Sequence, residues 1–341
     1  MISNNLITYP NKSIKYSMNK INQNGFRGVV VVDKNYKLKG FLSDGDLRKF
    51  ILKNENLNSS INNIYKKECF SLYKNDLFKI NIDELISKYY LIPVINKNHK
   101  VLDIITIDNY KSFFNHKQKS QYSGLIFAGG KGLRMGAISK VIPKPLLMVN
   151  DIPLIEINYK YLKFFKIQDI YLSLNYKKEM IKSYFKEKSL DAKYLIEKKP
   201  LGTAGPLGLI NESDISKGII CLNCDNIFEA DLKKIIKFHE NNKNDFTIVT
   251  TIYETNVPYG VLNTNDNKLI SIGEKPNLRN EINTGLYIIN KKLLKFIKAK
   301  KSLNMNNFIE LLLAKNIQIG TYKIKFDQFR DYGTSSKLNL A

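Results

Sequence analysis

Short apolar runs alternate with amphipathic stretches from about residue 120 onward. The apolar runs predict seven strands, at residues 124–128, 170–175, 192–196, 218–223, 246–251, 283–289 and 318–323. Apolar residues spaced three or four positions apart predict helices between several of these strands, at residues 154–165, 178–185 and 232–241. This alternation predicts an α/β domain with a largely parallel or mixed sheet and helices on both faces.

The first part of the chain contains an internal repeat. Residues 29–43 (VVVVDKNYKLKGFLS) and residues 92–106 (IPVINKNHKVLDIIT) align without a gap at an offset of 63. Each copy has two β-rich runs joined by a polar turn, which is the pattern of a hairpin. Amphipathic stretches precede both hairpins, at residues 13–24 and 75–89, and a helical stretch at residues 44–53 follows the first.

These patterns divide the chain into two parts. We expect an α+β module at residues 1–118, built from repeats at about 1–57 and 58–118, and an α/β domain at residues 123–341. Polar residues dominate the stretch 109–122, which predicts a linker. A chain of 341 residues is long for one domain and sufficient for two.

Composition narrows the class of protein. The net charge is +23, but only five of the 54 basic residues are arginine, the residue that reads phosphates and bases bidentately. We therefore expect a lysine-coated surface that attracts small anions, and no nucleic-acid partner. The chain has no apolar stretch of ~20 residues and no apolar secretory segment near its start, so no membrane partner is expected.

The cysteines argue against a disulfide scaffold. The chain has three, and this low number favours a reducing, cytoplasmic location. Cys221 and Cys224 are spaced like half of a zinc or redox motif. No second such pair exists and only three histidines are present, so two core cysteines are the better interpretation.

The strongest motif is a glycine-rich loop after the first strand of the α/β domain. Residues 125–134 read LIFAGGKGLR, and residues 143–146 read PKPL. Such a loop lets backbone N–H groups approach a polyphosphate closely. The spacing matches neither the Walker A loop nor the dinucleotide-binding fingerprint. Taken alone, the loop could be a generic glycine turn.

Further motifs follow in the same domain. They are EKKPLGTAG at 197–205, NCD at 223–225, YGV at 259–261, EKP at 274–276, NTGLY at 283–287 and DYGT at 331–334. Taken singly, some have ordinary structural explanations. Thr203 could cap a helix, Asp225 could start a turn, and Glu274 and Lys275 could lie in an exposed turn.

In combination, these motifs resemble those of the sugar-1-phosphate nucleotidyltransferases over about residues 123–336. The resemblance implies a Rossmann-like, GT-A-like mixed sheet, and a reaction between a nucleoside triphosphate and a sugar 1-phosphate. The implied nucleotide-binding residues are Ala128, Gly129, Gly130, Gly132, Arg134, Glu197, Gly202, Thr203 and Gly205. The implied sugar-phosphate-binding residues are Gly260, Glu274, Lys275 and Asn283. The implied catalytic residues are Arg134, Lys144, Asp225, Lys275 and Asp331.

The cofactor that the resemblance implies is Mg²⁺, held by Asp225 and Asp331. Carboxylate oxygens are hard ligands that suit this ion. In this interpretation Arg134 holds the departing pyrophosphate, Lys144 contacts the α-phosphate and Lys275 neutralises the phosphate of the sugar. No nucleophilic side chain is required, because positioning and charge neutralisation do most of the work in phosphoryl transfer.

The repeat near the start resembles a tandem pair of CBS domains, a Bateman module. Gly40, Ser43 and Asp46 match the motif with which that family often holds the ribose of an adenosine nucleotide. Asn109 stands at the equivalent place of Asp46 in the second repeat, so one motif at most is complete. The alternative is that Asp46 only caps a helix. CBS pairs often associate, so we expect a homodimer.

The order of the two domains resembles that of the guanylyltransferases of bacterial legionaminic acid synthesis. This implies GTP and α-D-glucosamine 1-phosphate as substrates and GDP-glucosamine as product. Two alternatives stay open: a mannose- or glucose-1-phosphate enzyme that uses another nucleotide, and a non-catalytic nucleotide sensor. The presence of both carboxylates and of the basic residues favours an enzyme. No hexapeptide repeat follows Asp331, so a fused acetyltransferase is not expected.

Overall fold

The computed structural model describes residues 2–53, 56–80, 82–110 and 120–334. The chain forms two compact units, which span residues 1–116 and 117–341. Most of the linker predicted at residues 109–122 lies outside the described residues.

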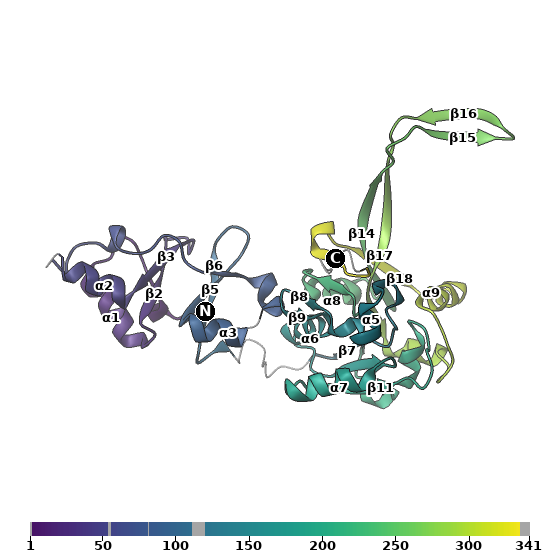
Figure 1. The fold of residues 1–341 in the computed structure, drawn as a ribbon, viewed down its shortest axis with the longest axis horizontal. Coiled ribbons are helices and arrows are strands. Elements are labelled where there is room, and N and C mark those ends of the chain that lie inside the picture. Colours follow the sequence, from purple (N-terminus) through teal and green to yellow (C-terminus); the bar gives the residue numbers. More distant parts are fainter. Residues whose placement is uncertain (1, 54–55, 81, 111–119, 335–341) are drawn as a thin grey trace. The chain divides into compact units, whose positions relative to one another are not determined.

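Two small sheets of the same topology form the N-terminal unit (Figure 1). In each sheet the first strand runs parallel to the second, and the second runs antiparallel to the third. The strands are β1 (Ile7–Thr8), β2 (Gly28–Val32) and β3 (Leu38–Ser43) in one sheet, and β4 (Leu72–Tyr73), β5 (Leu91–Ile95) and β6 (Val101–Thr106) in the other. The helices are α1 (Ile14–Asn24), α2 (Asp44–Ile51) and α3 (Ile82–Lys88). The repeat read from the sequence therefore has a structural counterpart.

The two repeats also share their capping interactions. The backbone N–H of Asp46 donates to Ser43 Oγ (3.1 Å), and Asp46 Oδ2 accepts from the backbone N–H of Ser43 (3.1 Å), which forms a capping box on α2. Thr106 and Asn109 exchange the same pair of hydrogen bonds, at 2.7 and 3.2 Å. Asp46 thus caps α2, and its Oδ1 also lies 3.9 Å from Lys66 Nζ.

A seven-stranded mixed sheet forms the centre of the second unit, in the order β11-β10-β7-β12-β17-β14-β18. The first four strands are mutually parallel, and β17 runs antiparallel to both β12 and β14. The strands are β7 (Tyr122–Phe127), β10 (Ile170–Leu174), β11 (Lys193–Ile196), β12 (Gly218–Asn223), β14 (Phe246–Asn256), β17 (Asn277–Asn290) and β18 (Ile319–Lys323). Their positions confirm the predicted α/β class.

Helices cover both faces of this sheet. On one face, Phe308 and Leu312 of α9 join the buried cluster that includes Leu125 and Tyr287. On the other face, Leu162 of α6 lies against β7 at Gly124. The helices are α5 (Ile138–Val141), α6 (Leu154–Phe164), α7 (Lys178–Glu187), α8 (Leu232–Asn241) and α9 (Met305–Ala314). Two-stranded ladders pair β8 (Met148–Val149) with β9 (Ile152–Pro153), and β13 (Asn226–Phe228) with β19 (Phe329–Asp331).

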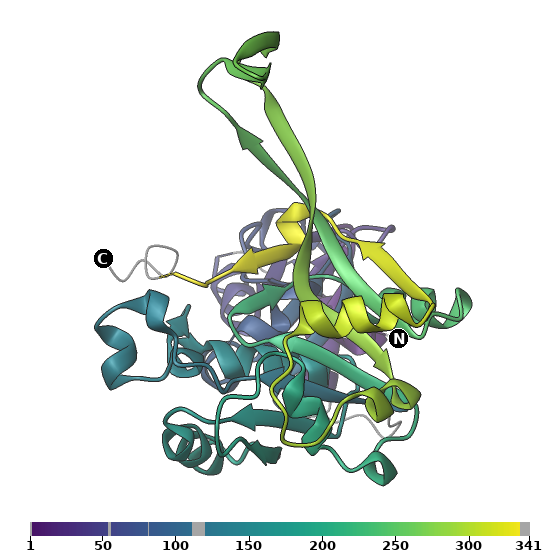
Figure 2. The same cartoon turned by 90° about the vertical axis from the view of Figure 1, so that its right-hand side faces the viewer.

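Strands β14 and β17 continue past the sheet as a two-stranded arm. Their pairing runs without a break from Thr250–Asn283 out to Asn256–Asn277. A second ladder, β15 (Val261–Asn265) with β16 (Lys268–Gly273), forms the end of the arm, as Figures 1 and 2 show. The strands predicted at 246–251 and 283–289 are therefore too short. The apolar pattern marks only the part of each strand that is buried in the sheet.

A buried histidine connects α8 to the sheet. His239 is 2% exposed, its Nδ1 lies 2.8 Å from Thr247 Oγ1, and its Nε2 lies 3.0 Å from Asn290 Oδ1. Burial lowers the pKa of His239 below its ordinary value, because the charged imidazolium is poorly solvated there. The folded protein consequently favours the neutral ring.

This histidine predicts a loss of stability in mild acid. The unfolded chain takes up the proton near the ordinary pKa of 6.5, and the folded chain does so only at lower pH. The contribution of neutral His239 to the free energy of unfolding is therefore full above about pH 6.5. It declines as the pH falls towards the pKa of the folded state. We expect the free energy of unfolding, measured with urea, to decline more steeply between about pH 7.5 and 5 for the wild type than for His239→Gln. Equal slopes would contradict this assignment.

Candidate active site

A pocket of about 710 Å³ opens at the carboxyl ends of the parallel strands of the seven-stranded sheet. The four parallel strands β11, β10, β7 and β12 end there, and residues at or just after their ends line it, among them Ser173, Glu197 and Asp225. Ligands of α/β folds bind outside the carboxyl ends of such strands. The topology therefore brings together motifs that are far apart in the sequence.

The glycine loop after β7 forms one wall. The backbone N–H of Ala128 donates to the carbonyl of Ser173 (3.0 Å), which continues the β7–β10 pairing into the loop. A Cβ on Gly129 would lie 2.6 Å from Glu197 Oε1, so only glycine lets the loop pass this carboxylate. Arg134, further along the loop, lines the pocket and is exposed.

Glu197 places a carboxylate in the wall behind the glycine loop. The residue is 6% exposed. Its Oε1 accepts a hydrogen bond from the Ser173 hydroxyl, and its Oε2 accepts one from the backbone N–H of Leu201 (2.9 Å). These bonds fix the carboxylate, and each oxygen keeps a further lone pair for a ligand.

Lys144 and Asp225 form an ion pair inside the pocket. Their side chains are 12% and 25% exposed. The Nζ of Lys144 comes from the short helical turn Lys144–Leu146, and Asp225 follows β12. Asn158 of α6 is fully buried and donates to the carbonyls of Leu154 (3.1 Å) and Cys224 (3.0 Å), which positions the backbone just before Asp225.

Asp331 lies near Asp225 on the β13–β19 ladder, but it is not among the residues that line the pocket. It stands opposite Asn226 in the register, and the backbone N–H of Tyr332 donates to the carbonyl of Asp225 (2.8 Å). Asp331 Oδ1 accepts from the backbone N–H of Gly333 (2.7 Å), and Gly333 lines the pocket. Two carboxylates carried on adjacent backbones fit a hard divalent cation such as Mg²⁺. Within the described residues, no cluster of three or more His, Cys, Asp or Glu side chains could hold a metal.

Most of the predicted nucleotide-binding residues line this pocket. They are Ala128, Gly129, Gly130, Gly132, Arg134, Glu197, Gly202 and Thr203, together with the predicted catalytic residues Lys144 and Asp225. Thr203 has a structural role as well, because its Oγ1 accepts from the backbone N–H of Met305 at the start of α9 (2.8 Å). Gly205 is buried behind the pocket, where a Cβ would lie 2.9 Å from the carbonyl of Lys301.

The predicted sugar-phosphate residues lie elsewhere. Gly260, Glu274 and Lys275 stand at the joint of the exposed arm between its two ladders, and the pocket as described includes none of them. Asn283 lies at the base of the arm, where it donates to Tyr287 Oη (2.8 Å) and accepts from the backbone N–H of Gly285 (2.9 Å). The structure thus forms the nucleotide side of the predicted site and leaves these residues apart from it.

Several site residues were not predicted. Lys131 and Asn223 line the pocket, Ser173 holds Glu197, and Asn158 holds the backbone before Asp225. Ser173 is the single polar residue of an otherwise apolar strand, and that interruption was the available signal. Asn158 lies in a helix with several other polar residues, so no such signal marks it in the sequence.

Cys221 and Cys224 are free and buried, as the sequence predicted. Burial raises the pKa of the Cys224 thiol well above its ordinary value, and the neighbouring Asp225 carboxylate raises it further. Such thiols are unreactive.

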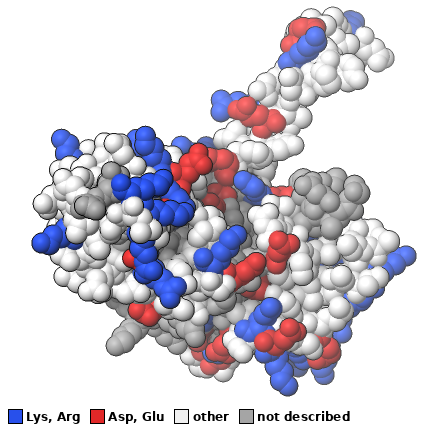
Figure 3. Space-filling model, turned by 60° about the vertical axis from the view of Figure 1, so that its left-hand side comes forward, with Lys and Arg blue, Asp and Glu red and all other residues white. Residues whose placement is uncertain are grey.

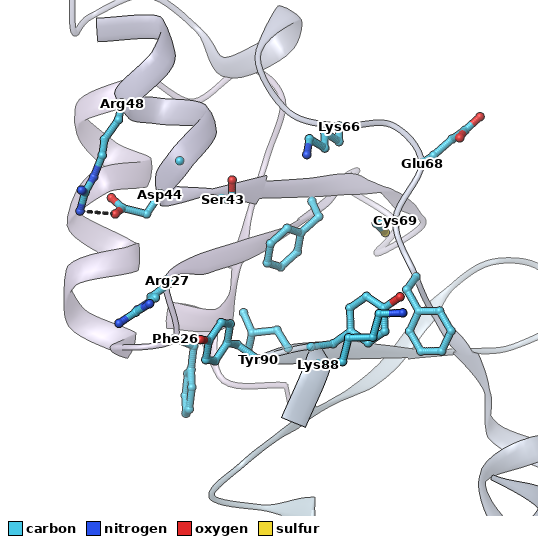
Figure 4. Close-up of a pocket in the computed structure, with 15 residues that line it drawn as sticks. Phe26, Arg27, Ser43, Asp44, Arg48, Lys66, Glu68, Cys69, Lys88 and Tyr90 are labelled. Atoms are coloured by element: carbon cyan, nitrogen blue, oxygen red, sulfur yellow. Dashed lines mark ion pairs between the residues drawn. The ribbon is translucent and has the colours of Figure 1, made fainter. Parts of the chain in front are cut away.

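The N-terminal unit contains a second pocket, of about 690 Å³ (Figure 4). Both repeats line it, with basic residues beside aromatic rings. The lining includes Arg27, Arg48, Lys66, Lys88, Phe26, Phe41, Phe70, Tyr89 and Tyr90. The guanidinium of Arg27 lies 5.6 Å from the ring centre of Tyr90, and Arg48 pairs with Asp44 at 2.6 Å. Of the predicted ligand residues, Ser43 lines the pocket as described, whereas Gly40 and Asp46 do not.

Across the residues that the structure describes, no helix is both long enough and apolar enough to span a membrane.

Sequence comparison matches residues 123–340 to the Nucleotidyl transferase family and residues 1–53 to the CBS domain. Mannose-1-phosphate guanyltransferase 2 of Candida glabrata is 34% identical over 208 residues, 57% of this chain and 57% of that protein. The D-glycero-alpha-D-manno-heptose 1-phosphate guanylyltransferase of Campylobacter jejuni is 31% identical over 192 residues, 54% of this chain and 84% of that protein. The match thus spans little more than half of the Candida relative.

A solved structure is also similar. It is a Bacillus anthracis protein provisionally named a glucose-1-phosphate thymidylyltransferase, crystallised with sucrose. It is 26% identical, with a TM-score of 0.50, over 64% of this chain and 93% of its own length. The family match covers the whole region that builds the pocket. The chain therefore belongs to the nucleotidyl transferase family, with a CBS domain at the start of its sequence.

Proposed function

We propose that this protein transfers GMP from GTP to a hexose 1-phosphate and releases pyrophosphate. The main support for GTP is the carboxylate of Glu197, which two hydrogen bonds hold in the pocket wall. Guanine presents two adjacent N–H donor groups, N1–H and the N2 amino group, which suit one carboxylate. Uracil and thymine present a single ring N–H. The names of the Candida and Campylobacter relatives support the same base.

The residues of the pocket suit the charges of this reaction. Arg134 binds the β- and γ-phosphates that leave as pyrophosphate. Lys144 moves from its ion pair with Asp225 to the α-phosphate, where it offsets the negative charge that develops in the transition state. Asn158 keeps the Asp225 backbone in place during this exchange. Both steps are charge neutralisation, and neither needs a nucleophilic side chain.

Asp225 and Asp331 would hold a Mg²⁺ ion. Such an ion would supply positive charge that offsets the negative charge of the phosphates. The two carboxylates belong to backbones joined by the Tyr332–Asp225 hydrogen bond, which supports their sharing one cation.

For the sugar we propose α-D-glucosamine 1-phosphate, with GDP-glucosamine as product and legionaminic acid synthesis as its use. The support is the resemblance in domain order, a CBS module ahead of the transferase. A panel of NTPs and hexose 1-phosphates with Mg²⁺, followed by pyrophosphate release, tests this choice. A preference for mannose or glucose 1-phosphate would replace the sugar and leave the guanylyl transfer intact.

Asp225→Asn tests the catalytic carboxylate. The change keeps the shape of the side chain and removes its charge, so kcat should fall by about 10²-fold or more. Asp231→Asn is the matched control, because Asp231 caps α8 and Asn also caps helices well. Near-wild-type turnover of Asp225→Asn with a normal thermal melt would remove Asp225 from the mechanism.

Glu197→Gln tests the choice of base. Replacing one carboxylate oxygen by an amino group puts a donor opposite the guanine donors, so kcat/KM for GTP should fall by about 10²-fold relative to UTP. Glu212→Gln, an exposed change in a surface turn, is the control. An unchanged ratio of GTP to UTP use would show that Glu197 does not contact the base.

We also propose that the N-terminal pocket binds an adenosine nucleotide. Basic groups that suit a phosphate lie beside rings that suit a base, and Arg27 already stacks on Tyr90. Arg27→Ala in the full chain should weaken AMP binding about 10-fold or more in calorimetry, whereas Lys53→Ala, which lies outside the pocket, should not. If wild type and both variants fail to bind AMP, ADP and ATP, the unit is a scaffold.

A further inference from the structure

The segment 131–142 runs from the glycine loop through α5 towards the turn that carries Lys144, and much of it is exposed. Leu133 and Val141 are 80% and 68% exposed, whereas Met135 is 2% exposed. Among the described residues, the backbone N–H groups of this segment that bond to backbone carbonyls do so within the segment itself. A segment with so little burial opens readily unless other contacts hold it.

Two side chains that follow β10 hold α5 from outside the segment. Tyr176 Oη donates to the carbonyl of Ser139 (3.1 Å). Lys177 Nζ donates to the carbonyl of Lys140 and, at 2.7 Å, to that of Val141. The last carbonyls of a helix have no partner within it, so these donors satisfy groups that α5 leaves open. Hydrogen bonds from an ammonium group are charge-assisted and stronger than those between neutral groups.

Lysines are common on the surface of this protein, so charge alone does not single out Lys177. In Figure 3 basic side chains occur in several separate places among acidic and uncharged ones. Lys177 is distinguished by its contacts. Within residues 120–334 as described, its ammonium has no carboxylate partner, and both of its hydrogen bonds go to the end of α5.

The residues that follow β10 also contact two other walls of the pocket. Asn175 Nδ2 donates to the carbonyl of Glu197 (2.7 Å), and the backbone N–H of Tyr176 donates to the carbonyl of Gly129 (3.4 Å). Strand β10 lies between β11 and β7 inside the sheet, so these contacts start from a rigid element. Residues 175–177 thus connect the sheet to the Glu197 wall, the glycine loop and α5.

We propose that Tyr176 and Lys177 are positioning residues that hold Arg134 and Lys144 at the separation that the phosphates of the nucleotide require. Arg134 lies before α5 and Lys144 after it, so contacts that fix α5 constrain both basic residues. The pocket as described includes neither Tyr176 nor Lys177, and both therefore act through α5. This inference rests on the proposed function, since it concerns the binding of the same triphosphate.

Tyr176→Phe and Lys177→Met test this role, because each removes the donor group and keeps most of the side chain. KM for GTP should rise about 10-fold and kcat should fall. KM for the hexose 1-phosphate that the wild type prefers should change less than about two-fold, because that substrate does not depend on Arg134. The loss should be equal for GTP and UTP, since α5 positions groups that bind phosphates and not the base.

Two further variants separate positioning from a general effect on folding. Lys178→Met is the matched control, because it removes the same charge at the first residue of α7, where the ammonium has no hydrogen bond within the described residues. This variant should behave as the wild type. Lys177→Arg should restore most of the nucleotide affinity, because a guanidinium group can also donate to two carbonyls. A variant that is merely less well folded would lose both substrates together.

Hydrogen exchange measures the contact itself and needs no activity. Without nucleotide, the backbone N–H groups of residues 131–142 should exchange about 10-fold faster in Lys177→Met and in Tyr176→Phe than in the wild type or in Lys178→Met. Unchanged exchange in both variants would overturn the inference. Faster exchange with an unchanged KM for GTP and UTP would overturn it as well, because α5 would then have no part in binding the phosphates.

The activity of the wild type distinguishes a failure of this inference from a failure of the proposed function. A wild type that turns over no nucleoside triphosphate refutes the proposed function and the positioning role together. An active wild type whose Tyr176→Phe and Lys177→Met variants keep its kinetic constants refutes the positioning role alone.

Discussion

The ion pair between Lys144 and Asp225 is the interaction on which the pocket depends. Asp225 is three-quarters shielded from water, and a carboxylate in such a place needs a positive partner. Lys144 provides it from the short helical turn Lys144–Leu146, which α5 separates from the glycine loop, and Asn158 fixes the backbone just before Asp225. The pair therefore joins the Lys144 segment to the end of β12, and in the proposed reaction the phosphates and the cation would compete for charges that are already in position.

The sequence predicts the buried part of this fold well, because burial leaves a readable pattern. The strand 218–223 and the helix 232–241 have the bounds predicted for them. The arm was missed because both of its faces meet water, so polar residues such as Asn256 and Asn280 interrupt the apolar pattern there. Its length follows from the pairing of two strands, which a single strand's pattern does not encode.

The candidate site was predictable to the extent that its residues belong to motifs with a defined spacing. Gly129, Glu197 and Asp225 come from three such motifs, and the parallel strand ends bring them to one pocket. Ser173 and Asn158 act through single hydrogen bonds to neighbouring segments, and a single sequence does not show these partners. The motif around Asp46 fits two interpretations, a ribose ligand and a helix cap. The structure shows the hydrogen bonds of the cap, which the sequence alone does not distinguish.

The pairing of β13 with β19 has a consequence for biosynthesis. Asp225 and Asp331 are 106 positions apart in the sequence, so translation produces Asp331 well after Asp225. The strands that end at the pocket, and the glycine loop, can form while that segment is still inside the ribosome. A nascent chain would then have its glycine loop and the ends of these strands in place before the segment that carries Asp331 can pair with β13.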